Sequence, residues 1–556
     1  MSIRRQLAKS QSLLRLSSLA LTERERSRLR ETPLDGYRYL PIELFATERG
    51  RYVFDARNVC FLEVDPVAFD VLGILRERPA TLDELVALLP RHDAESIRAA
   101  YADLLESQEE GLLTPYRFER LSKYTDADYE TILSRRMAGF TVFITTKCNL
   151  GCSYCIYGGQ YDQHEELSQR AMPWETLKAT MDFLAAHSED SKEVRLDFFG
   201  GEPLLAFPAI DRGVRYLKSI LNGQTVTVTI TSNGTILTDR ILDFLLEHDV
   251  YLQFSVDGGR ESHDRFRPIK GANLGSYDII LNNLQRIYDR DPDYFRRQMR
   301  LKGVLTTESV EADDHEFFSH PLVKIIIDSK NFVFLNLEPH HDLAKDADYF
   351  ERVDRLGKRL IELHDLSSEA DLLGNLNLKQ RALYHHTLGR FFEAQVLNRV
   401  FFEGMDATPF TKGCLTGYQE GAVDADGNIS ICLKSAKGGN FVVGNVKEGN
   451  WYFDKMTELN RTFHYDWAGC SSCFLQKICD LCYEKLDGEE GEWVAGRARF
   501  CEFNRARHRV IFETMLRVTE NNPALWDDLD RMIDNSTAGT PGEQQYGSQS
   551  LYSEQE

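Results

Sequence analysis

An apolar run leads directly into three cysteines in residues 141–155, which read TVFITTKCNLGCSYC. The run is typical of a buried β-strand, and Cys148, Cys152 and Cys155 follow it on one loop. Three thiolates on one loop can bind three irons of a 4Fe-4S cluster, which leaves the fourth iron open to another ligand. On these residues alone, an incomplete zinc site or a chance cluster stays an alternative.

Outward from this loop, short apolar runs alternate with helical stretches between residues 140 and 340. The predicted strands are 141–146, 194–199, 226–231, 251–256, 301–306 and 332–337. Such alternation predicts a parallel sheet with crossover helices, and six units suit a partial or complete β/α barrel. We therefore expect reactive groups at the carboxyl ends of the strands.

The ends of the second, third and fourth predicted strands carry glycine, hydroxyl, amide and carboxylate groups. The candidate ligand contacts there are Gly200, Gly201, Glu202, Ser232, Asn233, Ser255 and Asp257. Glycines allow close backbone approach, a carboxylate can accept from an ammonium group, and hydroxyl or amide groups can bind ribose and carboxylate oxygens. Each end alone would be an ordinary turn, but three in order behind the cysteines indicate a ligand site.

Residues 140–340 resemble the radical SAM superfamily through the Cys-x3-Cys-x2-Cys loop, with Tyr154 ahead of its last cysteine. The resemblance implies an α/β fold with a partial (β/α)6 TIM-like barrel, whose open iron binds the amino and carboxylate groups of S-adenosylmethionine (SAM). It places the two glycines and Glu202 near the SAM ammonium group, Ser232 and Ser255 near the carboxylate or ribose, and Tyr154 near the adenine.

Seven further cysteines gather towards the C-terminus, namely Cys414, Cys432, Cys470, Cys473, Cys479, Cys482 and Cys501. The middle four form paired Cys-x2-Cys knuckles, which are also a common zinc pattern. Seven thiolates fill one four-ligand cluster and three positions of another, so one site would need water, substrate or another residue. In a chain with no sign of secretion, these cysteines favour metal binding over disulfides.

The order of these seven cysteines resembles the SPASM extension of radical SAM enzymes that modify peptides and proteins. The resemblance implies an inner auxiliary cluster on Cys414, Cys432 and Cys482, and an outer one on Cys470, Cys473, Cys479 and Cys501. The expected cofactors are thus SAM and three 4Fe-4S clusters. The two residues between Cys479 and Cys482, where three are usual, leave the partition open. A vacant inner position would suit a substrate thiolate, whereas two filled clusters would favour electron relay.

A smaller module is predicted at residues 36–116. Strands at 52–54 and 60–62 precede helices at 66–77, 81–89 and 93–107, and Thr81 with Glu84 forms a capping box. This order resembles the RiPP recognition element, a winged-helix domain that captures leader peptides of ribosomal natural-product precursors. The implied binding mode is addition of an extended leader to a sheet edge. A structural cap on the barrel is the alternative.

The predicted chain order is a basic arm (1–35), the module (36–116), the barrel (117–345), a helical connector (346–409), the SPASM domain (410–510), a C-terminal helix (511–534) and a disordered tail (535–556). We expect metal, more than an apolar core, to organise 410–510. The net charge of −21 disfavours nucleic-acid and anionic-membrane partners. A cytoplasmic location is expected, with organelle targeting by the arm as the alternative.

The resemblances imply a peptide maturase that abstracts hydrogen from a ribosomal precursor peptide and installs a cross-link, most simply a thioether. The expected electron donor is flavodoxin or ferredoxin, and no general base is assigned. Carbon-carbon or carbon-oxygen cross-linking, epimerisation, and a non-enzymatic electron-transfer or scaffold role stay open. Sulfatase maturation is a further alternative, although those enzymes carry an aspartate right after the second SPASM cysteine, where this chain has Leu433.

Overall fold

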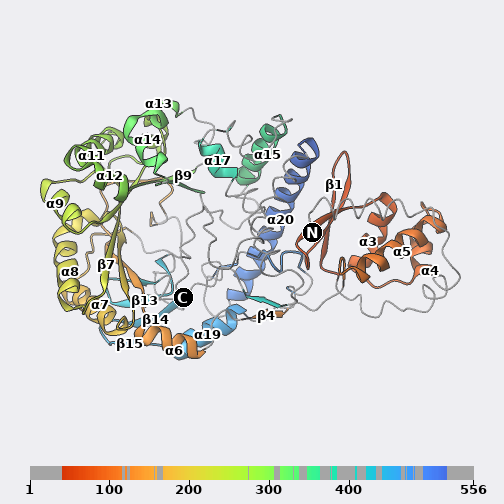
Figure 1. Ribbon diagram of the computed structural model, residues 1–556, viewed down its shortest axis with the longest axis horizontal. Coiled ribbons are helices and arrows are strands. Elements are labelled where there is room, and N and C mark those ends of the chain that lie inside the picture. Colours follow the sequence, from red (N-terminus) through yellow and green to blue (C-terminus); the bar gives the residue numbers. More distant parts are fainter. Residues whose placement is uncertain are drawn as a thin grey trace.

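The computed structural model (Figure 1) describes a large part of the chain. The described residues are 40–114, 119–121, 126–155, 157–158, 167–272, 274–305, 314–329, 331–336, 347–362, 376, 378–384, 407–409, 421–433, 441–464, 470, 473–479, 481–482 and 492–522. The predicted basic arm and C-terminal tail lie outside them. No helix in the described ranges has the length and apolar character needed to cross a membrane.

A parallel sheet forms the centre of the larger body. Its strands are β5 (Gly139–Thr145), β6 (Glu193–Gly200), β7 (Thr225–Ser232), β8 (Tyr251–Ser255), β9 (Met299–Leu305) and β10 (Phe332–Asn336). They pair in the order β10-β9-β8-β7-β6-β5, and every pair is parallel. The six predicted strands are confirmed. Because β10 ends the sheet and β5 does not pair with it, the described strands form an open, partial barrel.

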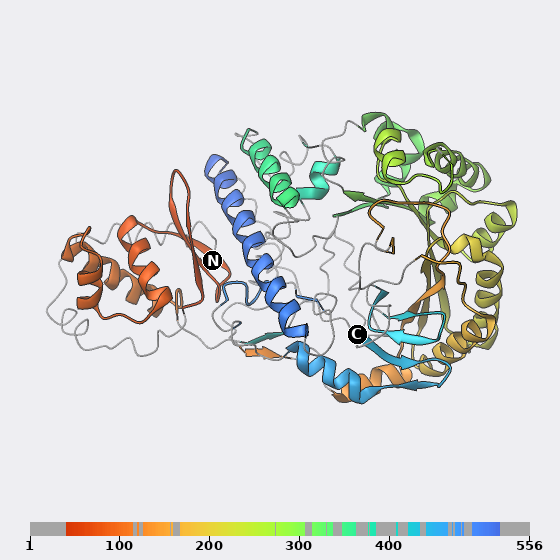
Figure 2. The same ribbon diagram turned by 180° about the vertical axis from the view of Figure 1, so that it is seen from behind.

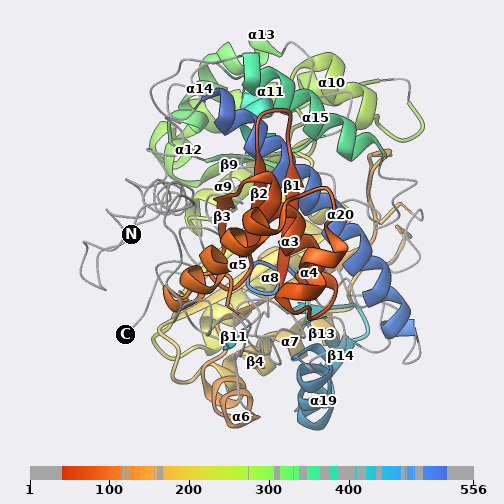
Figure 3. The same ribbon diagram turned by 90° about the vertical axis from the view of Figure 1, so that its right-hand side faces the viewer.

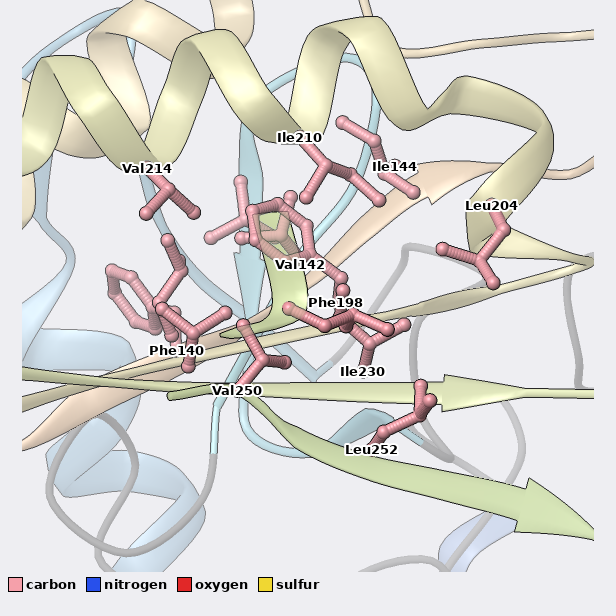
Figure 4. Close-up of a cluster of buried hydrophobic side chains, with 14 of the residues drawn as sticks. Phe140, Val142, Ile144, Phe198, Leu204, Ile210, Val214, Ile230, Val250 and Leu252 are labelled. Carbon is pink, nitrogen blue, oxygen red and sulfur yellow. The ribbon is translucent and has the colours of Figure 1, made fainter. Parts of the chain in front are cut away.

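Helices cover the outer face of this sheet (Figure 1). They are α6 (Asp126–Arg135), α7 (Trp174–His187), η2 (Pro203–Ala206), α8 (Phe207–Ile220), α9 (Asp239–Glu247), α10 (Arg260–Phe266), α11 (Tyr277–Arg290), α12 (Pro292–Gln298), α13 (His315–Ser319) and α14 (Pro321–Asp328). In Figure 4, Ile210 and Val214 of α8 point towards Val142, Phe198 and Ile230 of the strands. Each such fully buried side chain stabilises the fold by about 1.5–3 kcal/mol, which fixes the strand ends that carry the site.

The cysteine-rich region continues the same sheet. Its described elements are β12 (Ala422–Val423), β13 (Asn428–Ser430), β14 (Val442–Asn445), β15 (Asn450–Trp451) and α19 (Phe453–His464). Strand β12 pairs in parallel with β5, and the next three strands follow antiparallel. Val423, Ile429, Val443 and Trp451 are buried in the barrel core. The expectation that metal more than an apolar core organises this region is therefore wrong for these strands.

The N-terminal module contains an antiparallel sheet and three helices (Figure 3). The strands β1 (Ile42–Ala46), β2 (Arg51–Asp55) and β3 (Cys60–Glu63) pair in this order, and α3 (Pro66–Glu77), α4 (Leu82–Leu88) and α5 (Ala94–Glu109) cover one face. The three helices, two strands and the capping box of Thr81 and Glu84 agree with the prediction. Strand β1 was not predicted.

The other face of the module's sheet packs on the long helix α20 (Glu492–Asn521) (Figures 1 and 2). Phe512 of α20 lies 4.8 Å from Phe54, 5.3 Å from Phe61 and 5.7 Å from Phe45 between ring centroids. The predicted C-terminal helix was expected to begin at residue 511, but α20 begins at Glu492. Its phenylalanine contacts join the module to the body.

The predicted connector is helical in its described parts, α15 (Ala347–Glu362) and α17 (Leu378–Tyr384). Its buried residues pack with α20 in the same apolar cluster as the module. Two short parallel strands, β4 (Glu119–Leu121) and β11 (Ala407–Pro409), complete the described elements.

Candidate functional site

The loop that carries Cys148, Cys152 and Cys155 leaves the carboxyl end of β5 and is attached to the segment after α10. The backbone N–H groups of Gly151 and Ser153 donate to the carbonyls of Pro268 (2.9 Å) and Phe266 (3.1 Å). All three cysteines are free thiols and partly exposed. The structure therefore presents three sulfurs from one loop that backbone hydrogen bonds attach to the end of α10 and the residues after it.

The two glycines at the end of β6 pack against this loop. The Gly201 N–H donates to the Thr145 carbonyl at 2.8 Å, and the Glu202 N–H donates to the Lys147 carbonyl at 2.7 Å. A β-carbon on Gly201 would lie 2.1 Å from the Lys147 carbonyl oxygen, and Gly200 has a φ of +126°. The close backbone approach predicted for these glycines is thus made to the cysteine loop itself.

Glu202 joins the ends of β6 and β7. Its fully buried carboxylate accepts from the Leu204 N–H (2.9 Å), the Ser232 hydroxyl (2.9 Å) and the Asn233 N–H (2.7 Å). Burial outweighs these bonds and raises the pKa of Glu202 to about 7. The side-chain amide of Asn233 donates to Asn149 of the cysteine loop at 2.8 Å. Three predicted contacts therefore meet at this loop, while their roles towards SAM stay predictions.

Asp257, at the end of β8, is fully buried and paired with Arg267. Arg267 donates to both carboxylate oxygens, at 2.8 and 3.0 Å, and the Val304 N–H and the Tyr154 hydroxyl donate as well. Burial opposes ionisation, but the Arg267 guanidinium outweighs it and holds the pKa of Asp257 below its usual range. The structure thus uses Asp257 and Tyr154 to hold the cysteine loop, and their predicted SAM contacts are not tested.

Sequence reasoning missed Arg267, whose partner is a carboxylate ten residues earlier in the chain. It also missed buried His263, whose pKa is lowered to about 4 by burial and by Arg267. Its ring contacts the Ser276 hydroxyl at 2.8 Å. No local sequence pattern distinguishes His263 in α10, or Arg267 directly after α10, from an ordinary surface residue. Ser255, by contrast, lies where it was predicted, partly exposed at the end of β8.

The thiol chemistry of the loop fits an iron-sulfur cluster. Burial raises the pKa of Cys148, of Cys152 (to about 12) and of Cys155, so these groups are neutral thiols at neutral pH and would release protons on binding metal. No three Cys, His, Asp or Glu side chains in the described ranges are already arranged to hold a metal ion.

The second cysteine group is described except for Cys414, which lies outside the described residues. Cys470 is buried, and the other described members, Cys432, Cys473, Cys479, Cys482 and Cys501, are partly exposed. The Cys473 N–H donates to the Cys470 carbonyl at 3.1 Å, and the buried Arg497 guanidinium donates to the Cys470 sulfur at 3.2 Å. Burial and the neighbouring Cys479 raise the pKa of Cys473 to about 12. A cation at the sulfur suits an anionic thiolate centre.

A groove lies in the N-terminal module, between β3 and helices α3 and α5. It contains a cavity of about 60 Å³ whose lining includes Leu62, Val71, Leu72 and Leu104. Strand β3 pairs with β2 on one side only among the described strands. The groove therefore runs beside a sheet edge that can accept a further strand.

Residues 142–293, from within β5 into α12, match the radical SAM superfamily. The chain contains a radical SAM domain. The matched range includes the cysteine loop and the ends of β5 to β8, whereas the second cysteine group and the groove of the N-terminal module lie outside it. The α/β fold with a sheet rich in parallel strands agrees with the expected partial barrel.

Several curated proteins are similar to about a quarter of this chain. The serine-type anaerobic sulfatase-maturating enzyme of Bacteroides thetaiotaomicron is 31% identical over 22% of this chain and 30% of its own length. The sporulation killing factor maturation protein SkfB of Bacillus subtilis is 32% identical over 25% and 31%. The radical SAM cyclopropyl synthase TigE of Paramaledivibacter caminithermalis is 27% identical over 28% and 36%. The chain thus spans about a third of each relative.

Among solved structures, native anSMEcpe with bound AdoMet is similar with a TM-score of 0.45 and 18% identity. The similarity covers 68% of this chain and 99% of that one.

Proposed function

We propose that this protein is a radical SAM peptide maturase that cross-links a ribosomally made precursor peptide. The observation that carries the proposal is the loop of three free thiols at the carboxyl edge of the parallel sheet, tied to the ends of β6 and β7 through Glu202 and Asn233. A 4Fe-4S cluster on this loop with bound SAM would supply reductive cleavage of the sulfonium and a 5'-deoxyadenosyl radical.

The chain's own residues would hold and orient the cofactors. Cys148, Cys152 and Cys155 would supply three thiolates, and the strand ends that carry Gly200 and Ser255 would face the methionine and ribose parts of SAM. The buried network of Tyr154 would keep the loop in place during catalysis. The helices that cover the outer face of the barrel sheet would exclude water from that face.

The auxiliary centres are part of the same proposal. The inner cluster would use Cys414, Cys432 and Cys482, and the outer cluster Cys470, Cys473, Cys479 and Cys501. Arg497 supports the outer assignment because its hydrogen bond to the Cys470 sulfur would be retained by a thiolate ligand. An inner cluster with only three cysteine ligands would have an open position for a cysteine of the substrate. This open position favours a thioether over a carbon-carbon or carbon-oxygen link.

The proposed cross-link joins a peptide carbon to a cysteine sulfur. Removal of one hydrogen atom from the carbon would leave a carbon radical, and a cysteine thiol of the same peptide would lose its proton and bond to this carbon. The one electron left over would need an acceptor, which an auxiliary iron-sulfur centre held by the second cysteine group would supply. The peptide thus loses two hydrogens, and flavodoxin or ferredoxin would supply the electron that starts each turnover.

The groove of the N-terminal module supports a peptide substrate. A leader in extended conformation could add to the edge of β3 and place an aliphatic side chain among Leu62, Leu72 and Leu104. This is the role expected of a RiPP recognition element. The alternative, a structural cap, does not require a cavity beside an unpaired strand edge.

The decisive experiment is anaerobic incubation with SAM, dithionite and the precursor peptide encoded beside this protein, followed by tandem mass spectrometry. Loss of two hydrogens localised to one residue pair supports cross-linking. Unchanged mass with deuterium uptake from solvent would instead indicate epimerisation. The variant with Cys148, Cys152 and Cys155 all changed to alanine should be inactive, whereas Cys60→Ala, in the module core, should be active.

Sulfatase maturation is the second candidate, favoured by the sulfatase-maturating relatives. Against it, Leu433 follows Cys432 where such maturases carry an aspartate, and Leu433 packs on the apolar cluster of Phe143 and Tyr157. Modification of a sulfatase peptide in place of the precursor would reverse this ranking. A non-enzymatic electron-transfer role requires that no 5'-deoxyadenosine form with SAM and dithionite.

A further inference from the structure

The groove of the N-terminal module has acidic groups at its edge. Its lining includes the aliphatic residues Leu62, Leu72 and Leu104 and the acidic residues Glu63, Asp65 and Asp103. The lining thus includes three carboxylate residues, and none of its residues is Lys, Arg or His. An apolar floor with only negative charge around it is complementary to a ligand that combines an aliphatic group with a cation.

Two of these carboxylates line the groove from different helices. Asp65 caps α3, where its Oδ1 accepts from the N–H groups of Val67 (2.7 Å) and Ala68 (2.9 Å). Asp103 stands on α5, where it also lines the groove. Glu63 instead lies opposite Tyr52 in the pairing of β2 with β3.

The Asp103 carboxylate has no hydrogen-bond or ion-pair partner among the described residues, and only the backbone carbonyl of Asp103 accepts, from the Ser107 hydroxyl. Burial, together with the Glu106 and Asp65 carboxylates, raises the pKa of Asp103 to about 6. A half-buried carboxylate of this kind is stabilised in its charged form by a cation brought to it from outside. The floor of the cavity lies directly beside it, because Leu104 and Ala100 are neighbours of Asp103 on α5.

We propose that the groove selects a leader peptide in which a lysine or arginine stands near an aliphatic residue, the cation pairing with Asp103 and Asp65 and the aliphatic side chain filling the cavity. This inference rests on the proposed function, since it names the charge class of the leader that the module captures. The rest of the leader is held by backbone pairing along β3, which carries no sequence information.

The test uses the full-length protein, purified without oxygen, and the fluorescein-labelled leader of the precursor encoded beside it. Fluorescence anisotropy gives Kd for the wild type, for Asp103→Asn and for Glu95→Gln, a matched control on the exposed face of α5. Asp103→Asn should weaken binding about tenfold, while Glu95→Gln should leave Kd within twofold. Asparagine keeps the shape of the side chain and removes a buried charge, so the variant should fold.

A thermodynamic cycle identifies the partner in the leader. Each leader Lys or Arg is changed to Gln in turn, and one such change should weaken binding to the wild type about tenfold yet have no further effect on Asp103→Asn. A second variant, Ala68→Phe, fills the groove. It separates the inference about the leader's charge from the proposal that the groove binds the leader. Binding that Ala68→Phe abolishes but Asp103→Asn leaves unchanged overturns the charge inference alone. Absence of leader binding to the wild type, or binding unaffected by both variants, overturns the groove as leader site.

Discussion

Replacing Arg267 with methionine should destabilise the radical SAM domain strongly, because it leaves the Asp257 carboxylate buried without its cation. Asp257 is fully buried and Arg267 is 7% exposed. Removing one partner of a buried pair costs about 3–5 kcal/mol. For a domain of 150–250 residues each kcal/mol lowers Tm by about 2–4 °C, so the expected loss is about 6–20 °C. Differential scanning calorimetry of the anaerobically purified protein measures it.

The pH dependence of this loss identifies its cause. In the wild type, the lowered pKa of Asp257 contributes stability that is present at neutral pH and is lost only as pH falls through that pKa. Without Arg267, burial would raise the pKa of Asp257 above its unfolded value. The folded state would then carry a penalty at neutral pH that fades as protonation neutralises the group. The difference in Tm between wild type and Arg267→Met should therefore shrink from pH 7.5 to pH 5.

The double variant Arg267→Met with Asp257→Asn provides the control. It removes both charges, so its loss of Tm should be less than half of that of Arg267→Met alone, and it should not depend on pH in the same way. A loss below about 1 kcal/mol for Arg267→Met, or equal losses for the single and double variants at both pH values, would refute the reasoning.

Three further perturbations test other contacts. Gly201→Ala should reduce iron loading at least fivefold, measured by iron analysis, because its β-carbon meets the cysteine loop, whereas Gly151→Ala in the same loop makes only an ordinary contact and should load normally. Phe512→Ala should cost about 3–5 kcal/mol and speed tryptic release of the N-terminal module, whereas Leu88→Ala, at an exposed site, should not. Because burial raises the pKa of Glu202 to about 7, folding stability should fall as pH rises from 4.5 to 7, and Glu202→Gln should remove most of that slope in urea unfolding.

Local patterns were sufficient where one segment determines its own structure. The six parallel strands were predicted because each is a short apolar run that folds between two helices. The module's helices were predicted because their caps are local, as with Thr81 and Glu84. The cysteine loop and the strand ends followed from the general rule that such sites lie at carboxyl ends of parallel strands.

Contacts between distant segments could not be predicted. The partners of Glu202 are an example, because Ser232 and Asn233, which donate to its carboxylate, stand about thirty residues later in the chain. Strands of two to four residues, such as β12 and β15, are too short for alternation to be detected. The partner of Phe54 and Phe61 is Phe512, and nothing within the module indicates a helix more than four hundred residues away.

The docking of the module on α20 has a consequence for the proposed precursor. Apart from the phenylalanine contacts, Glu43 pairs with Arg509 at 3.1 Å, and the Tyr52 hydroxyl donates to Glu520 at 2.7 Å. Strand β3 is thereby anchored to the body that carries the cysteines, and a leader bound along it starts from a set position. Under the proposed leader binding, only substrate residues at a suitable number of positions beyond the leader can reach the barrel. Lengthening or shortening that spacer should therefore move the modification along the peptide by the same number of residues.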